Sequence, residues 1–388
     1  INGKYNQEKL TSMENAFKQK ESSEKQEAIQ IAKQRGWKIK FTTKDGRMLE
    51  LQRVVNNKPI YYTTFNVAAA KSTRVNHLNS GGSLGLNLDG QNMTAYVWDG
   101  GIARASHQEY DGAGGSNRFS NGDSASLNYH AAHVTGTIIA SGVVANAKGM
   151  APQAKAIGYD WNSDLAEATS AAANGMLVSN HSYGYAARNQ QGQVQLPQYF
   201  FGGYIDDSRD WDNLMFNAPN YLMVVAAGND GSDDTANNNP TGGYGFDKLT
   251  GHSTSKNNLV VAAANDANID SNGNLTSVTI ANFSSEGPTD DFRIKPDIAG
   301  NGVSVYSTYD SSNTAYNSIS GTSMASPNVT GSLVLLQQHH NNINSSYMKA
   351  ATLKGLALHT ADDAGVSGPD AVFGWGLLNT KAAAEAIT

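Results

Sequence analysis

The sequence predicts an α/β protein with a doubly wound, mostly parallel sheet, preceded by a small α+β segment. From about residue 80, apolar runs alternate with glycine-rich loops and helix-like segments. Near-continuous apolar runs are typical of strands buried on both faces, and helices between them indicate crossover connections on both faces of a sheet. We expect strands near residues 93–98, 155–159, 176–180, 221–226, 258–263 and 303–306, and helices near residues 130–141, 163–174 and 323–340.

Residues 1–66 differ from the rest and predict a separate unit. Residues 11–35 are rich in Glu, Lys and Gln with a narrow apolar face, which predicts a helix that ends at Gly36. Alternating segments predict three strands, at residues 37–42, 48–55 and 60–65. So few elements bury little apolar surface, so we expect this unit to dock on something larger. The small, polar residues 67–80 predict a linker that is easy to cleave, followed by a large domain at 81–388.

Composition narrows the class of function. A formal net charge of −6 over 388 residues is modest and argues against a nucleic-acid partner. No apolar run approaches the length of a membrane-spanning helix. The chain has no cysteine, which excludes disulfide bonds. Oxygen-bearing side chains crowd residues 229–239, which is compatible with a structural calcium ion, but no ligand-spaced motif favours a metal over a hydrated loop.

The most informative motif is a serine among small residues at the start of a predicted helix. It reads Gly321-Thr322-Ser323-Met324-Ala325-Ser326-Pro327. Small neighbours let a substrate approach closely, and the helix start places the Ser323 hydroxyl near the positive end of the helix dipole. These features suit a nucleophile and equally an ordinary N-cap, so the assignment depends on a base, an orienting acid and an oxyanion donor elsewhere.

The candidate base is one of two histidines, His130 and His133, on one face of a predicted helix. Their spacing lacks the glutamate of a zinc-protease motif, which favours one functional histidine and one packed or surface histidine. The candidate acid, Asp99, ends a predicted strand, where ligands of α/β sheets usually bind. The candidate oxyanion donor, Asn229, follows the apolar run 221–227 and Gly228. Taken alone, Asp99 and Asn229 are also ordinary turn residues.

Together, the order Asp, His, Asn, Ser resembles that of the subtilisin-like serine proteases, or subtilases. The resemblance covers roughly residues 80–388, and within the subtilases it is greatest to secreted members from Bacteroidetes bacteria. The matching segments are Val97-Trp98-Asp99-Gly100-Gly101-Ile102, His130-Ala131-Ala132-His133-Val134-Thr135-Gly136-Thr137, Gly149-Met150-Ala151-Pro152, Asn180-His181-Ser182-Tyr183-Gly184, Ala226-Ala227-Gly228-Asn229, Phe283-Ser284-Ser285-Glu286-Gly287-Pro288, Lys295-Pro296-Asp297-Ile298 and the serine run.

The resemblance implies a serine endopeptidase with the triad Asp99, His130 and Ser323 and with Asn229 in the oxyanion hole. His133 is then a structural neighbour. The chain departs from the family at Ala131 and Ala132, where Gly and Thr are usual, and at Gly100, where Thr or Ser is usual. The resemblance also implies a secreted bacterial enzyme whose signal peptide has been removed. The family's commonest calcium loop corresponds to residues 141–146, which are poor in side-chain oxygens.

The resemblance further implies where a substrate binds. Ser182, Tyr183 and Gly184 match the edge segment to which a peptide adds as an extra strand. Gly184, Ala227 and Gly228 are small and leave room for a primary pocket. We expect this pocket to accept large apolar side chains, because no acid is clearly placed to demand Lys or Arg. The long insertion at residues 190–212 either shapes substrate preference or covers the sheet.

Two alternatives bear on function. The N-terminal unit is either a permanent structural extension or, as the resemblance favours, a propeptide that assists folding and acts as an intramolecular inhibitor. An esterase of the α/β-hydrolase type needs its serine before the acid and the histidine, so chain order excludes it. A catalytically inert binding protein with the same fold is the remaining alternative to an enzyme of protein or peptide substrates.

Overall fold

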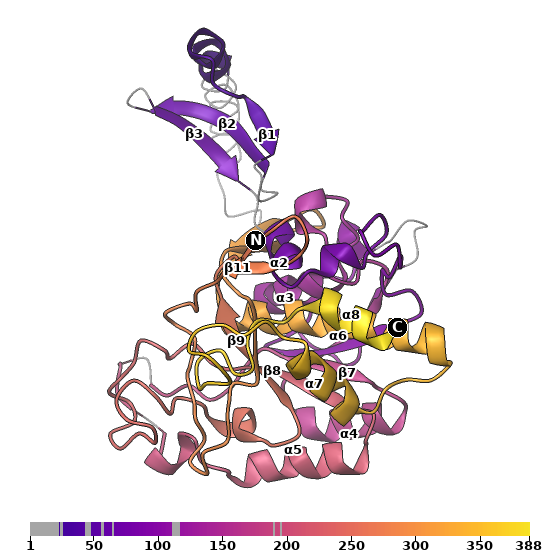
Figure 1. Cartoon of the computed structure of the whole chain (residues 1–388), viewed down its shortest axis with the longest axis vertical. Helices are drawn as coiled ribbons and strands as arrows, with labels where there is room; N and C mark the ends of the chain where they lie inside the picture. The colour runs from indigo at the N-terminus through magenta and orange to yellow at the C-terminus, as the bar shows by residue number, and fades with distance from the viewer. Residues whose placement is uncertain are drawn as a thin grey trace, which may run out of the picture. The chain divides into compact units, whose positions relative to one another are not determined.

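The chain forms two compact units, residues 1–64 and residues 65–388 (Figure 1). The computed structural model describes residues 23, 26–42, 48–55, 58–63, 66–110, 117–188, 191–194 and 196–388. Within these ranges, no helix is both long enough and apolar enough to cross a membrane.

The N-terminal unit combines a helix with a three-stranded antiparallel sheet. Residues 26–35 are helical, and Gly36, with a φ of 69°, ends the helix in a left-handed conformation that glycine adopts without strain. The strands β1 (Lys40–Thr42), β2 (Met48–Val55) and β3 (Lys58–Thr63) pair in chain order. Ala28, Ala32 and Leu51 form a small core. The earlier part of the predicted helix, residues 11–22, lies outside the described residues.

The larger unit contains a seven-stranded, wholly parallel sheet, which confirms the predicted α/β class. The strand order is β12-β9-β8-β7-β4-β6-β5. The strands are β4 (Thr94–Asp99), β5 (Phe119–Asn121), β6 (Lys155–Asp160), β7 (Val178–His181), β8 (Leu222–Ala226), β9 (Leu259–Ala264) and β12 (Ile298–Asn301).

Helices cover both faces of this sheet, as the alternation of side chains in β8 illustrates. Leu222 and Val224 belong to the core beneath α3 (Tyr129–Ile139) and α6 (Thr322–Asn344). Met223 and Val225 belong to a second core beneath α4 (Asp164–Ala173) and α5 (Asp206–Asn217). Figure 1 shows these two pairs of helices on opposite sides of the strands. The connections β4 to β6 and β6 to β7 run in opposite directions across the sheet, which places a topological switch beside β4.

The remaining elements are short or peripheral. They are the helices α2 (Asn66–Ser72), α7 (Ala350–His359) and α8 (Thr380–Ile387), and the hairpins of β10 (Asn268–Ile269) with β11 (Leu275–Ser277) and β13 (Val305–Thr308) with β14 (Tyr316–Ile319). Of these, α7 and α8 follow α6 in the chain and contribute buried side chains to the same core as α6.

The expected parallel strand at 303–306 is wrong. That segment contributes to β13, which pairs antiparallel with β14, and the last strand of the main sheet is β12. The sequence of β12 is Ile-Ala-Gly-Asn, which lacks the β-branched pattern of its neighbours. Its small residues are needed because α6 packs closely: a Cβ on Gly300 would lie 2.9 Å from Val329 Cγ2 and 3.0 Å from the Ala325 carbonyl oxygen. Close packing has therefore removed the usual strand signal.

The expected linker at 67–80 also differs from the structure. Residues 66–72 form α2, a 3₁₀ turn follows at residues 75–77, and residues 72–75 are at most 1% exposed. The Arg74 guanidinium is buried, forms an ion pair with Asp362 and donates to the Leu378 carbonyl oxygen over 3.3 Å. The side chains of α2 are mostly small because the segment packs tightly. Small residues are also typical of flexible linkers, so the composition alone was misleading.

Candidate active site

Asp99 and His130 form an acid–base pair at the carboxyl end of β4, with Asp99 buried and His130 partly exposed. Asp99 is the last residue of β4 and is 1% exposed, and its Oδ1 and Oδ2 lie 2.8 and 2.9 Å from His130 Nδ1. Burial disfavours the imidazolium, but the Asp99 charge and its hydrogen bond outweigh this, so the pKa of His130 lies above its ordinary value of 6.5. The contact also orients the ring, because a hydrogen on Nδ1 leaves Nε2 as the basic nitrogen.

Asn128 joins the two elements that carry this pair. Its Oδ1 caps α3 by accepting from the His130 backbone N–H over 2.7 Å. Its Nδ2 donates to the Gly100 carbonyl oxygen, 2.9 Å away and directly after β4. One side chain therefore sets the start of the histidine helix relative to the end of the aspartate strand. The sequence analysis gave Asn128 no role, although an Asn immediately before a helix is a capping signal.

At Gly100, where the family usually has Thr or Ser, the backbone contacts both Asp99 and Trp161. The Gly100 N–H donates to Asp99 Oδ1 over 2.7 Å, so the carboxylate receives a main-chain hydrogen bond at this position. A Cβ on Gly100 would lie 3.0 Å from the ring of Trp161, which packs over the backbone here. Ala131 and Ala132 are buried within α3, in keeping with a helix that packs closely against its neighbours.

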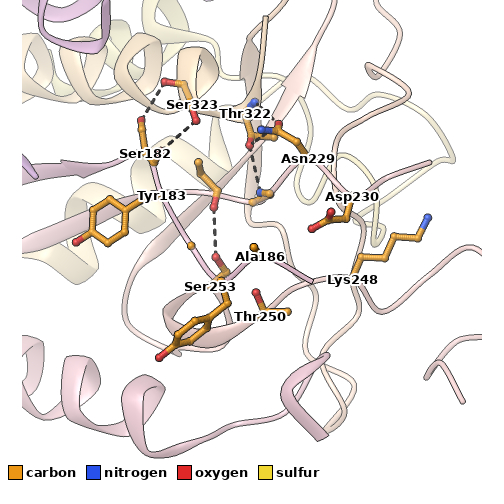
Figure 2. Close-up of a pocket in the computed structure, with 15 residues that line it drawn as sticks. Ser182, Tyr183, Ala186, Asn229, Asp230, Lys248, Thr250, Ser253, Thr322 and Ser323 are labelled. Atoms are coloured by element: carbon orange, nitrogen blue, oxygen red, sulfur yellow. Dashed lines mark hydrogen bonds between the residues drawn. The ribbon is translucent and has the colours of Figure 1, made fainter. Parts of the chain in front are cut away.

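Ser323 lies in the first turn of α6, at the edge of a cavity (Figure 2). It is 8% exposed, and its Oγ donates to the Ser182 carbonyl oxygen over 3.1 Å, while Ser182 Oγ donates to the Ser323 carbonyl oxygen over 2.9 Å. Among the hydrogen bonds of the described residues, that of the Ser323 hydroxyl goes to Ser182 and not to His130. The three expected triad residues are thus all at the ends of elements on this side of the sheet, with the Asp–His contact formed.

Asn180 positions the Ser182 segment relative to α6. This residue of β7 is fully buried, and its Nδ2 donates to Ser182 Oγ over 2.9 Å. Its Oδ1 accepts from Ser326 Oγ at 2.8 Å and from Thr330 Oγ1 at 3.0 Å, both on α6. Sequence analysis included Asn180 in a matching segment and assigned it no function, because nothing in its position along the chain indicates a contact with residues almost 150 positions away.

Asn229 follows β8 and is held by the residue that precedes the serine. Its Oδ1 accepts from both the N–H and the hydroxyl of Thr322, at 2.9 and 3.0 Å. This arrangement orients the side-chain amide and directs its Nδ2 away from Thr322. The Gly228 N–H in turn donates to Thr322 Oγ1 over 3.1 Å. Gly228 has a φ of 115°, and a Cβ there would lie 2.8 Å from Ser285 Oγ, so the turn that presents Asn229 requires glycine.

The cavity beside Ser323 has a volume of about 250 Å³ and brings together all five residues expected to bind substrate. These are Ser182, Tyr183, Gly184, Ala227 and Gly228. The Tyr183 side chain, however, points away from the cavity, and its hydroxyl donates to Asp164 Oδ2 over 2.6 Å (Figure 2). Its contribution to the wall is therefore made close to its backbone. The insertion at 190–212, whose role the sequence left open, includes the first half of α5.

His133 has the environment of a structural residue. It is fully buried, and its Nε2 lies 2.8 Å from the Val305 carbonyl oxygen, on β13. Burial lowers the pKa of His133 to about 4, so the ring is neutral near pH 7.

The oxygen-rich loop at 229–239 contains two ion pairs. Arg188 pairs with Asp233, and Lys248 pairs with Asp234. Over the ranges that the structure describes, no group of three or more His, Asp or Glu side chains is arranged to hold a metal. Asp233 and Asp234, two of the carboxylates that suggested calcium from the sequence, thus have protein cations beside them. A structural calcium ion stays an untested expectation.

The fold and the positions of these residues define a class: serine proteases built on a parallel α/β sheet. The chain belongs to the subtilase family, whose model (Peptidase S8) matches residues 76–376. It is 30% identical to subtilisin DY of Bacillus licheniformis over 307 residues, which are 76% of this chain and 92% of that protein. An extracellular serine protease of Serratia marcescens is 42% identical over 69 residues, which are 18% of this chain and 6% of that protein.

A solved structure supports the fold assignment. The CspB protease of Clostridium perfringens aligns with a TM-score of 0.64 over 82% of this chain and 98% of that chain. The sequence identity is 15%, so this likeness concerns the fold alone.

Proposed function

We propose that the chain is a secreted serine endopeptidase of bacterial origin that hydrolyses peptide bonds through an acyl-enzyme on Ser323. The observation that carries this proposal is the buried Asp99 carboxylate on His130 Nδ1, which leaves Nε2 free to take a proton. Family membership and the position of Ser323 at the cavity edge support it. Secretion is supported by the similarity to an extracellular serine protease of Serratia marcescens.

In the proposed reaction, Ser323 Oγ leaves its hydrogen bond to Ser182 and attacks the substrate carbonyl carbon while His130 Nε2 takes the hydroxyl proton. Asn229 Nδ2 and the Ser323 N–H donate to the oxyanion. The C–N bond breaks as His130 returns the proton to the leaving amine. Water then attacks the ester carbonyl carbon while His130 takes its proton. The bond to Ser323 Oγ breaks, His130 returns that proton to Oγ, and the acid is released. No cofactor takes part in these steps.

An activity-based label on Ser323 tests the proposal against the inert alternative. A fluorophosphonate should label wild-type protein at Ser323, identified by mass spectrometry, and the same sample should hydrolyse casein. Ser323→Ala should abolish both signals, whereas Ser311→Ala, at an exposed serine, should abolish neither. A folded, processed protein that neither takes the label nor cleaves casein would establish the inert binding protein instead.

We also propose that the N-terminal unit, residues 1–64, is an inhibitory and folding-assisting propeptide. The burial of Ala69 in α2 and of residues 72–75 favours cleavage upstream of these residues, because a later cut would remove buried residues of the larger unit. Sequencing the N-terminus of active enzyme should therefore give a first residue at Phe65 or Asn66. Full activity of a chain that still begins at Ile1 would contradict the propeptide, and a start beyond Arg74 would contradict the structural role of α2.

A further inference from the structure

One wall of the cavity beside Ser323 carries a carboxylate, that of Asp230. The residue follows Asn229, and its backbone N–H donates to Ser285 Oγ over 3.0 Å, which fixes the turn from which the side chain projects. Figure 2 shows the carboxylate of Asp230 directed toward the interior of the cavity. The sequence placed no acid clearly in this pocket, because Asp230 lies in Asn229-Asp230-Gly231, an ordinary turn sequence.

The nearby cations are engaged elsewhere. Lys248 also lines the cavity, but it is 5% exposed and its ammonium points away from the interior (Figure 2). Its Nζ lies 2.8 Å from Asp234 Oδ1 and 3.2 Å from Glu286 Oε2, and it also donates to the Gly231 carbonyl oxygen.

Arg188 is the second cation that influences Asp230 electrostatically. Its Nε and Nη2 donate to the two carboxylate oxygens of Asp233, over 2.5 and 2.9 Å. Arg188 and Lys248 are thus the two cations beside four carboxylates, those of Asp230, Asp233, Asp234 and Glu286. The surroundings of Asp230 therefore carry an excess of negative charge, and of these carboxylates Asp230 is the one that lines the cavity.

Asp230 is consequently a partly desolvated anion with incomplete compensation. Burial raises the pKa of its carboxyl group, and the charge of Asp233 raises it further. A cation that enters the cavity would stabilise this carboxylate, because opposite charges attract more strongly where water is partly excluded. The other walls are neutral: Gly184, Ala227 and Gly228 provide room, and the hydroxyls of Thr250 and Ser253 are potential hydrogen-bond acceptors.

We propose that Asp230 makes this cavity select a positively charged side chain, Lys or Arg, at the residue whose carbonyl group Ser323 attacks. This inference rests on the proposed function and names its substrate class. It replaces the expectation of a large apolar residue, which rested on the small wall residues and on the lack of an acid clearly placed to demand Lys or Arg. Their size admits a long side chain, and the chemistry of the cavity then favours one with a charged end.

Matched fluorogenic peptides that differ only at the cleaved residue test this selection. With active-site-titrated wild type, kcat/KM should be higher for Arg and Lys than for norleucine, which has a similar length and no charge. Asp230→Asn should lower the Arg-to-norleucine ratio by about tenfold. Asp230→Lys should reverse the preference toward Glu. Asp206→Asn, which makes the same charge change at a side chain 86% exposed on α5, should keep the wild-type ratio.

A wild type that prefers norleucine, or an Asp230→Asn ratio equal to that of wild type, would overturn the assignment. A binding measurement separates this outcome from failure of the proposed function. In Ser323→Ala, calorimetry should detect tighter binding of a peptide with Arg than of its norleucine counterpart, and Asp230→Asn added to that variant should remove the difference. Selective binding of the Arg peptide without turnover in wild type would support the role of Asp230 and refute catalysis. Turnover in which the Arg and norleucine peptides bind equally and are cleaved equally would support catalysis and refute the role of Asp230.

Discussion

Replacing Asp99 with Asn should disable the enzyme by trapping the wrong tautomer of His130. The Gly100 N–H donates to Oδ1, so the amide oxygen of an Asn at this position is held there. The amide nitrogen then takes the place of Oδ2, 2.9 Å from His130 Nδ1, and donates to it. This contact favours the tautomer with its hydrogen on Nε2, which cannot accept the proton of Ser323, over the tautomer in which Nδ1–H donates to the amide oxygen at the Oδ1 position. By analogy with other serine proteases, kcat should fall about 10⁴-fold, or about 5 kcal/mol in the barrier.

The same substitution should shift the pH profile in a defined direction. His130 acts as a base only when neutral, so activity rises with pH through its pKa. In wild type, burial lowers that pKa and Asp99 raises it by more, so the acid limb of kcat/KM lies above pH 6.5. Without the charge of Asp99 the effect of burial remains, and the acid limb should move to lower pH.

Steady-state kinetics from pH 4 to 9 on a neutral peptide substrate, with residual activity confirmed by fluorophosphonate titration, would measure both effects. The substitution should leave KM within a few-fold of wild type, because Asp99 is buried and does not line the cavity. An acid limb that stays in place or moves to higher pH would refute the electrostatic reasoning. A loss confined to KM would refute the assignment of Asp99 as the residue that orients His130.

Three further predictions follow from contacts of the site and its supporting elements. Asn229→Ala should lower kcat by about 10²-fold to 10³-fold, which raises the activation barrier by about 3 kcal/mol, and should leave KM near that of wild type. An unchanged kcat on a peptide substrate would disprove the oxyanion role. Glu109→Gln should lower the free energy of unfolding by about 3 kcal/mol in urea titrations, because an amide nitrogen cannot accept the hydrogen bonds that reach each carboxylate oxygen. His133 should contribute about 3 kcal/mol to the free energy of unfolding above pH 6.5, and this is lost as the pH falls toward 4, since the unfolded state takes up the proton first. His133→Gln should flatten the plot of unfolding free energy against pH between these values. The same slope in wild type and variant would contradict the role of His133.

The sequence was informative where the chemistry needs a particular side chain. Asp99, His130, Ser323 and Asn229 could be proposed because acid, base, nucleophile and amide donor occur in a distinctive order beside predicted strands and helices. The buried strands β4, β6, β7, β8 and β9 were predicted because their apolar runs carry a strong signal. Both kinds of prediction rest on features that a single segment displays by itself.

Features that depend on distant neighbours could not be predicted. The strand β12 and the helix α2 consist of small residues whose meaning depends on what packs against them. Asn128 and Asn180 hold the site together through neutral hydrogen bonds between elements far apart in the chain. The orientation of Asp230 into the cavity depends on the turn held by Ser285 and on the ion pairs of neighbouring cations. A sequence contains these residues but gives no sign of which partner each will meet.

The loop after the histidine helix illustrates how a local composition can be explained by a distant residue. Residues 141–146 are poor in side-chain oxygens, and the structure gives the reason. The N–H groups of residues 142–144 all donate to the carboxylate of Glu109, at 2.7, 3.0 and 2.8 Å. Ser141 Oγ and the Tyr316 hydroxyl donate to the same group, at 3.1 and 2.7 Å.

Five donors converging on one fully buried carboxylate make this loop a binding site for an anion that the chain itself supplies. A cation at the same place would face N–H groups in place of carbonyl oxygens, so the backbone conformation and the charge of Glu109 are matched to each other. Because α3 ends directly before this loop, the hydrogen bonds of Glu109 also fix the far end of the helix whose first turn carries His130. Loss of those bonds in Glu109→Gln should therefore destabilise the fold first, and should impair catalysis only to the extent that α3 shifts.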